Sequence, residues 1–447
     1  MSVFARILLA VIALAVAIGH PAAINARNTT TISVAASAGL APVNWRQFRF
    51  DARHTGFNPF ERVLNATNVP ALGLEWEAQL GRLVFSSSPA VVGGVVYIGS
   101  SDGTLWAYPE QGCGAVLCTS PLWKSIPLWQ IIDSPTVANG IVYVGSQTSF
   151  TSNDGRLNAF AAAGCGDAVC APLWQGLAGK DSILDSSPAV ADGVVYIGAY
   201  DGRLYAFAAN GCGAATCTPL WVGVTGGTIE SSPTVSSGMV YIGSDDGYLY
   251  AFAAGGCGAS FCAPLWRGPL GSPAYSSTPA LADGVVHIGS AHALSAFDAH
   301  GCGASTCAPL WQAIDEDQFF AGSPAVAGGR VYIGYATGLA VYSAAGCGTT
   351  TCGPLWILFG AGFQAQVESS PTVANGVVYA GRNTGEVLAW SAEPCGSFVC
   401  DSIWRGPTGD QLVNSSPTVV RGKLYIGSAD NLFPEDQQGR LYVFALP

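Results

Sequence analysis

Charged residues are scarce in this chain of 447 residues. They make up 11% of it, against about 25% in a typical soluble domain. Lysine occurs only at Lys124, Lys180 and Lys423, and the formal net charge is −11. Binding to nucleic-acid phosphates needs clustered Lys and Arg, so we exclude a nucleic-acid partner.

Long apolar runs and the common catalytic motifs are also missing. No apolar run reaches the ~20 residues of a membrane-spanning helix. The sequence has no nucleophile elbow and no phosphate-cradling glycine loop. Its five histidines include no pair at ligand spacing. The motifs therefore give no support to hydrolase, nucleotide-binding or histidine-metal chemistry.

The N-terminus indicates export. Arg6 precedes an apolar run over residues 7–19, and small residues follow at Ala22 and Ala23, as in a secretory signal peptide. We predict a signal peptide over residues 1–23 and a flexible leader over residues 24–44. An uncleaved membrane anchor is the alternative for the first segment. After cleavage we expect no membrane span and a secreted or periplasmic protein.

Internal repeats dominate the remainder. A unit that is clearest at residues 186–221 occurs eight times, at a spacing of about 47 residues. Its first element is Ser/Thr-Pro, with prolines at Pro89, Pro135, Pro188, Pro233, Pro279, Pro324, Pro371 and Pro417. The second, Val/Leu-Tyr-Ile/Val-Gly, is centred on Tyr97, Tyr143, Tyr196, Tyr241, His287, Tyr332, Tyr379 and Tyr425. The third, Leu-x-Ala-aromatic, ends at Tyr108, Phe160, Phe207, Phe252, Phe297, Tyr342, Trp390 and Phe444. The fourth carries a tryptophan: Trp76, Trp123, Trp174, Trp221, Trp266, Trp311, Trp356 and Trp404.

These four elements predict the fold. Turn signals such as Asn139-Gly140 and Asp192-Gly193 separate them. A period of about 40–50 residues with four strands is typical of propeller blades. We predict an all-β protein, a single eight-bladed β-propeller of four-stranded antiparallel blades over residues 45–447, and a monomer. The eighth unit lacks a fourth strand, so we expect the N-terminal strand around Trp76 to complete the last blade and remove an open sheet edge.

The cysteines fit this plan. All 14 occur as Cys-x4-Cys between the third and fourth elements: Cys113/Cys118, Cys165/Cys170, Cys212/Cys217, Cys257/Cys262, Cys302/Cys307, Cys347/Cys352 and Cys395/Cys400. Blade eight lacks a pair because its third and fourth strands come from the two chain ends. Even number, local pairing and the export signal imply seven disulfides. We expect each to close only a short hairpin loop and to contribute roughly 2 kcal/mol. Zinc binding is the alternative, but loops spread around a ring cannot converge on one ion.

The repeat SSPAV-x-x-G-VVYIGS-x-DG-x-LYAF…LW resembles that of pyrroloquinoline-quinone (PQQ)-type β-propellers. The segment over residues 45–59, followed by Asn68, Val69 and Trp76, is similar to the start of such proteins. The resemblance covers residues 45–447. The family includes quinoprotein alcohol dehydrogenases and non-enzymatic outer-membrane assembly lipoproteins, so it implies the fold and leaves the function open.

The family's dehydrogenases hold the quinone in a central funnel, typically against a disulfide between adjacent cysteines, and carry long insertions with calcium ligands and the catalytic aspartate. This chain has no Cys-Cys dipeptide, near-minimal blades and no Cys-x-x-Cys-His haem motif. We therefore assign no catalytic residue. We predict an exported, non-catalytic binding or scaffold propeller with an envelope or extracellular protein partner. The alternative is a PQQ-dependent dehydrogenase that oxidises alcohols or sugars at a divergent funnel site, and only this alternative implies PQQ.

Acidic residues recur near one position of the repeat. Three residues before each proline lie Ser86, Ile132, Asp185, Glu230, Ser276, Ala321, Glu368 and Asn414, and Asp133 follows Ile132. Because inner strands start at the channel, we expect Asp133, Asp185, Glu230, Glu368 and Asn414 near one channel mouth, where their oxygens suit Ca²⁺. A solvated acidic rim is the alternative.

Variable loops between blades are expected to line the same face and to offer a ligand surface. They include residues 315–320, Lys180-Asp181, Phe363-Gln364 and Asp410-Gln411.

Overall fold

The computed structural model describes residues 43–447 apart from 85, 132, 148–153, 180–182, 184, 318, 336–337, 361–365, 410–414 and 430–437. The predicted signal peptide over residues 1–23, residues 24–42 of the predicted leader, and Asn414 lie outside the described residues. So do Lys180-Asp181, Phe363-Gln364 and Asp410-Gln411.

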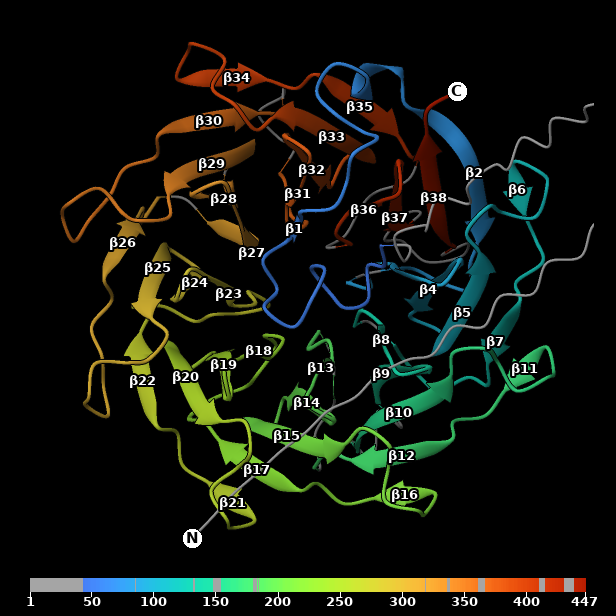
Figure 1. Cartoon of the computed structure of the whole chain (residues 1–447), viewed down its shortest axis with the longest axis horizontal. Helices are drawn as coiled ribbons and strands as arrows, with labels where there is room; N and C mark the ends of the chain where they lie inside the picture. The colour runs from blue at the N-terminus through green and yellow to red at the C-terminus, as the bar shows by residue number, and fades with distance from the viewer. Residues whose placement is uncertain are drawn as a thin grey trace, which may run out of the picture. The chain divides into compact units, whose positions relative to one another are not determined.

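Eight small antiparallel sheets follow one another around a central axis, as predicted (Figure 1). We number these blades 1 to 8 by their innermost strands: β3 (Ala90–Val92), β8 (Thr136–Ala138), β13 (Ala189–Ala191), β18 (Thr234–Ser236), β23 (Ala280–Ala282), β27 (Phe320–Ala327), β31 (Thr372–Ala374) and β36 (Thr418–Val420). The second strands are β4 (Val95–Ser100), β9 (Ile141–Gln147), β14 (Val194–Ala199), β19 (Met239–Ser244), β24 (Val285–Ser290), β28 (Arg330–Tyr335), β32 (Val377–Arg382) and β37 (Lys423–Ala429). The third are β5 (Thr104–Pro109), β10 (Gly155–Ala161), β15 (Arg203–Ala208), β20 (Tyr248–Ala253), β25 (Ala293–Asp298), β29 (Gly338–Ser343), β33 (Glu386–Ser391) and β38 (Gly439–Ala445). The outer strands of blades 1 to 7 are β7 (Trp123–Ser125), β12 (Trp174–Leu177), β17 (Trp221–Val224), β22 (Trp266–Pro269), β26 (Trp311–Ile314), β30 (Trp356–Phe359) and β35 (Trp404–Pro407).

Blade 8 is closed by the N-terminal part of the chain, as predicted. Its outer strand is β2 (Gly73–Gln79), which pairs antiparallel with β38. Trp76 lies opposite Val443 in this register. The ring therefore ends on a ladder between the two chain ends, and the last blade keeps no open third-strand edge.

The predicted hairpin turns are present. Asn139 and Asp192 have φ values of 50° and 49°, and the glycines that follow, Gly140 and Gly193, have 78° and 79°. Two successive positive φ angles define the tight turn whose twist matches that of the flanking strands. Asn and Asp tolerate the first of these positions, and Gly adopts the second without strain.

All seven predicted disulfides are present, with Cα–Cα distances between 5.3 and 5.7 Å. The short loops that they close also contact the neighbouring blade. The second cysteine of most loops lies in a short fifth strand that pairs in parallel with the outer strand of the preceding blade: β6 (Leu117–Cys118), β11 (Val169–Cys170), β16 (Thr216–Cys217), β21 (Phe261–Cys262) and β34 (Val399–Asp401). In the remaining two loops, the backbone N–H groups of Cys307 and Cys352 donate to the carbonyls of Arg267 and Gln312, both at 2.8 Å. Each disulfide loop therefore also joins two neighbouring blades at the rim.

Each disulfide closes a short loop, as expected, because its two cysteines are separated by 5 positions in the sequence, but the burial of one cysteine in each pair was not expected. The first cysteine of each pair is exposed, but the second is buried. The buried members are Cys118, Cys170, Cys217, Cys262, Cys307, Cys352 and Cys400. Each packs in the same apolar cluster as the outer-strand tryptophan of the preceding blade, as Cys400 does with Trp356. The second cysteine is thus a core residue between blades, because the parallel pairing of its loop carries it over the neighbouring outer strand.

The repeat tryptophans lie between blades. Trp123 of blade 1 donates its Nε1–H to the carbonyl of Ala162 in blade 2 at 3.2 Å, and the hydroxyl of Tyr97 donates to the same carbonyl at 2.9 Å. Gly164, with a φ of 80°, lies against the Trp123 ring, where an added Cβ would be 2.7 Å from Cδ1. This contact explains why a glycine precedes the first cysteine of the loop.

His287 takes the tyrosine place in blade 5. Its Nε2 lies 3.2 Å from the Ala344 carbonyl, which also accepts from Trp311 Nε1. Burial lowers the pKa of His287 to about 4, so this histidine is a neutral core residue.

Two hydroxyl sets tie the inner strands together. The residue before each repeat proline accepts a hydrogen bond from the equivalent backbone N–H of the preceding blade, and the series closes from Ser416 back to Ser88. Its members are Ser88, Ser134, Ser187, Ser232, Thr278, Ser323, Ser370 and Ser416. One residue earlier, six of the eight blades have a serine that accepts from the glycine N–H of the second strand within its own blade, as Ser186 does from Gly198 at 2.9 Å. The Ser-Ser-Pro motif is thus a device for packing blades around the axis.

The N-terminal segment closes one end of the channel, which the sequence analysis did not anticipate. Residues 45–58 lie over the inner strands near the centre of Figure 1 and make a hydrogen bond to the same repeat position in every blade. The partners are Val91, Val137, Val190, Val235, Leu281, Val326, Val373 and Val419. Most of these bonds run from the strand N–H to a backbone carbonyl of the segment. Near its end, β1 (Phe57–Asn58) pairs in parallel with β31. We call residues 45–58 the plug.

The plug continues into the seam between blades 7 and 8. A short 3-10 helix, η1 (Val69–Ala71), precedes β2. Leu72 offers its carbonyl to Trp404 Nε1 at 3.1 Å, the role that a loop carbonyl fills elsewhere in the ring. No described helix is both long enough and apolar enough to cross a membrane.

Candidate functional site

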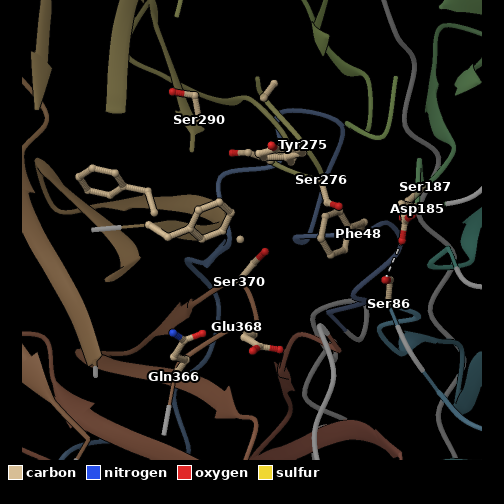
Figure 2. Close-up of a pocket in the computed structure, with 15 residues that line it drawn as sticks. Phe48, Ser86, Asp185, Ser187, Tyr275, Ser276, Ser290, Gln366, Glu368 and Ser370 are labelled. Atoms are coloured by element: carbon tan, nitrogen blue, oxygen red, sulfur yellow. Dashed lines mark hydrogen bonds between the residues drawn. The ribbon is translucent and has the colours of Figure 1, made fainter. Parts of the chain in front are cut away.

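The open end of the channel holds a cavity of about 290 Å³. Phe48 from the plug lines it, so the plug forms part of its base (Figure 2). Ser187 and Ser370 of the hydroxyl series also line it. The cavity therefore has the plug and the inner strands as its base, and a concave site on a rigid scaffold is a usual position for a ligand.

Aromatic side chains form one part of the wall. Tyr275 and Phe319 come from neighbouring inter-blade loops, and their ring centroids lie 6.0 Å apart. They are 43% and 50% exposed, whereas Phe320 beside them is buried. Phe319 and Phe320, from the loop predicted over residues 315–320, thus line the face on which we expected that loop. Large aromatic side chains that are half-exposed at a cavity are typical of a ligand-binding surface.

Carboxylates supply the charge. Asp185 accepts hydrogen bonds from Ser86 Oγ and from the Tyr200 hydroxyl, both at 2.9 Å. Glu368 lies on a different part of the wall (Figure 2), where its Oε1 accepts from Asn383 Nδ2 at 3.1 Å. Both partners of Asp185 and the partner of Glu368 are neutral. Among the described residues that line the cavity, none is Lys or Arg.

Glu230 lies next to this wall and interacts with Asp185. Its Oε2 accepts from Ser276 Oγ at 3.3 Å. Burial, then the charges of Asp185 and Asp245, raise the pKa of Glu230 to about 7. Burial also raises the pKa of Asp185 above its usual range, against the effect of its hydroxyl donors. Like charges that share a poorly hydrated space shift pKa values in this direction.

Asp133 lies inside blade 2 rather than on the cavity wall. It is 1% exposed and stands where six other blades have the first serine, so its Oδ2 accepts from Gly145 N at 2.6 Å. Its Oδ1 has no partner among the described residues. Burial raises its pKa well above the usual value, and the charge of Asp185 adds to this rise. The repeat thus replaces a hydroxyl by a buried carboxyl at one point.

The predicted calcium ligands are therefore only partly brought together. Asp185 and Glu230 are neighbours, Glu368 lies elsewhere on the wall and Asp133 is internal, while Asn414 lies outside the described residues. The described part of the chain contains no group of three Asp, Glu, His or Cys residues arranged to hold a metal ion. Calcium binding stays a prediction.

The cavity residues that the sequence did not indicate include Phe48, Tyr275 and Gln366. Tyr275 adjoins the repeat position that was examined, and a comparison of the flanking columns would have found it. Its φ of 46° is a left-handed conformation, which no pattern in the sequence indicates. Phe48 could not have been found, because its place depends on how the plug crosses the channel.

The repeat and the closed ring define an eight-bladed β-propeller. Residues 171–256 match a PQQ-repeat family model described as outer membrane protein assembly factor BamB, which confirms the resemblance for that stretch. No curated protein sequence matches the chain significantly.

Solved structures share the fold at low sequence identity. The quinohemoprotein alcohol dehydrogenase of Comamonas testosteroni is 14% identical, with a TM-score of 0.66 over 90% of this chain and 80% of that one. BamB of Moraxella catarrhalis is 16% identical, with a TM-score of 0.55 over 83% and 97%. The computationally designed protein Ika8 is 14% identical, with a TM-score of 0.58 over 83% and 99%. An enzyme, an assembly factor and a designed protein thus share the fold, which by itself does not choose a function. The seven disulfides fit an extracytoplasmic protein.

Proposed function

We propose that this protein is an exported, non-catalytic binding propeller that receives its ligand or protein partner at the open mouth of the channel. The observation that carries this proposal is the plug. Because residues 45–58 bond to all eight inner strands, the channel is accessible from one end and its cavity is rigid at the base. The half-exposed Tyr275 and Phe319 at this mouth are suited to contact a partner.

The wall chemistry supports binding over quinone-dependent oxidation. A PQQ-type quinone carries several carboxylates, and an anion of this kind needs Lys, Arg or a cation to balance it. Among the described lining residues the charged ones are Asp185 and Glu368, and both are acidic. The residues present therefore fit such a quinone poorly.

The proposal is tested by site-specific photocrosslinking. Benzoylphenylalanine is placed at Tyr275 in the mouth and, as a matched control, at Phe398, which is 57% exposed on the disulfide loop of blade 7. We expect Tyr275 to capture a defined species from the envelope fraction and Phe398 to capture none of it. Equal capture at both positions, or at neither, contradicts a mouth-centred binding function.

A second measurement addresses the dehydrogenase alternative. The purified protein is mixed with PQQ and Ca²⁺, passed through gel filtration and tested for dye reduction with alcohols and sugars. Stoichiometric retention of quinone absorbance together with dye reduction would overturn the proposal. We expect neither.

A further inference from the structure

We propose that the open channel mouth binds an organic cation, an ammonium or guanidinium group, between the aromatic wall and the carboxylates. This inference rests on the proposed binding function and names its ligand class. The group belongs either to a free small molecule or to a side chain of a partner peptide.

The first support is that the negative charge of the wall lacks compensation within the described part of the chain. There, Asp185 bonds to hydroxyls and Glu368 to an amide. The ion pairs found among the described residues involve other acids, such as Glu110 with Arg421 and Glu393 with Arg330. A carboxylate in a poorly hydrated cavity is unfavourable without a cation. A ligand that carries a cationic group would offset this unfavourable free energy.

Asp133 lies behind the wall and supplies no balancing charge. Its carboxyl is 1% exposed, and its Oδ1 lacks a partner among the described residues. It lies close enough to Asp185 for the two charges to interact. Burial raises the pKa of Asp133 well above its usual value and so favours the neutral form of this carboxyl, which leaves Asp185 and Glu368 as the source of the negative charge at the cavity.

The second support is the aromatic content. Phe48, Tyr275 and Phe319 line a cavity of about 290 Å³ together with Asp185 and Glu368. Aromatic faces attract cations within about 6 Å of the ring centroid. A chamber that combines such faces with carboxylates selects a cationic group over a neutral or anionic one of the same size.

A cation already present in the plug does not satisfy the cavity acids. The Arg49 guanidinium carbon lies 6.0 Å from the centroid of the Phe48 ring. Its hydrogen bonds go to the backbone carbonyls of His54 and Pro324, and the side chain is buried. The Arg49 guanidinium therefore stabilises the plug and forms no ion pair with the acids that line the cavity.

The test is a calorimetric titration with three probes of similar size: agmatine as the cation, a neutral diol of equal length and a dicarboxylate. We expect agmatine to bind and the other two to give no heat. Asp185→Asn and Glu368→Gln should each weaken agmatine binding about tenfold. Asn suits position 185 because the φ of 63° there is one that Asn tolerates as well as Asp. Asp167→Asn, in an exposed disulfide loop, is the control for net charge and should bind like the wild type.

A further titration distinguishes a peptide side chain from a free small molecule as the origin of the cation, and the outcomes below separate failure of this inference from failure of the proposed function. An acetylated, amidated arginine peptide that binds more tightly than agmatine identifies a peptide side chain as the source, and the reverse order identifies a free amine. Binding of the diol or dicarboxylate instead of agmatine, or unchanged affinity in both cavity variants, overturns the cation inference while leaving the binding function standing. Absence of any binding, together with no capture at Tyr275, overturns both. Far-UV circular dichroism confirms that each variant is folded.

Discussion

The two ends of the channel are built from the same eight repeats, but one end is covered by the plug and the other is lined by exposed loop side chains. At the plugged end, residues 45–58 form a hydrogen bond with at least one backbone group in each blade. At the open end, loops hold Tyr275 and Phe319 half-exposed, and Asp185 has no ion pair within the described part of the chain. The comparison separates positions that stabilise the ring from positions that remain available to a ligand.

The largest difference should come from removing one aromatic side chain at each end. Trp45 in the plug is 2% exposed and packs on Phe50 at a centroid distance of 5.3 Å. Trp45→Ala should lower the free energy of unfolding by about 3–5 kcal/mol. Phe319→Ala at the open end should change it by less than about 0.5 kcal/mol. Urea unfolding monitored by circular dichroism measures both, and equal effects would remove the distinction between the two ends.

The plug should also govern stability in acid. Burial, and secondarily the charge of Arg49, lower the pKa of His54 to about 3, and neither ring nitrogen has a partner among the described residues. The unfolded chain takes up a proton near pH 6.5 and the folded chain does not, so stability falls as the pH drops from 6.5 towards 3. His54→Phe should remove about 2–3 kcal/mol of the loss between pH 7 and pH 4.5.

Urea unfolding at the two pH values checks this effect. His300→Gln serves as the control, since that side chain is 85% exposed, and it should leave the acid profile unchanged. His287 contributes a loss of the same sign, because burial lowers its pKa to about 4. A profile that His54→Phe leaves as steep as the wild type would show that the plug opens before His54 is protonated.

The acids near the open end should have the opposite pH dependence. Asp133 replaces a serine and holds a proton more tightly in the folded state than in the unfolded state, so its contribution is lost as the pH rises through its folded pKa. Asp133→Ser should raise stability at pH 7 by about 1–2 kcal/mol, since it removes an unpartnered buried oxygen.

Thermal unfolding at pH 7 compares this variant with Ser186→Ala. The second change deletes the hydroxyl that accepts from Gly198 N in blade 3 and should lower stability by about 1 kcal/mol. If both substitutions destabilise, Asp133 has a structural role that its contacts do not show.

The features that recur in every blade could be predicted from the sequence. The blades, the closure through Trp76, the hairpin at Asn139-Gly140 and the disulfides all follow from spacing, because local turn chemistry and alternation act over a few residues. The burial of the second cysteine, as at Cys307, did not follow, because it depends on pairing with another blade. The plug could not be predicted in this way, because it occurs once and contacts such as that of Asn58 with Val419 produce no repeating pattern in the sequence. The cavity was predicted in part. Counting along the repeat identified Asp185 and Glu368 as wall residues, but it grouped Asp133 with them. Asp133 is buried because it lies one residue closer to its repeat proline than Asp185 and Glu368 do.

The smallest effect should belong to Glu230, which is half-buried beside the mouth. Its pKa of about 7 is raised first by burial and then by Asp185 and Asp245, so its contribution to stability is lost as the pH rises from about 4.5 through 7. Glu230→Gln should flatten this part of the profile by less than about 1 kcal/mol, because solvent screens a partly exposed group. Carboxyl NMR titration gives the pKa directly. Asp185→Asn should lower it by removing a like charge, and a bound cation should lower it in the wild type. If agmatine leaves the titration of Glu230 unchanged, any bound cation lies away from the Asp185 side of the cavity.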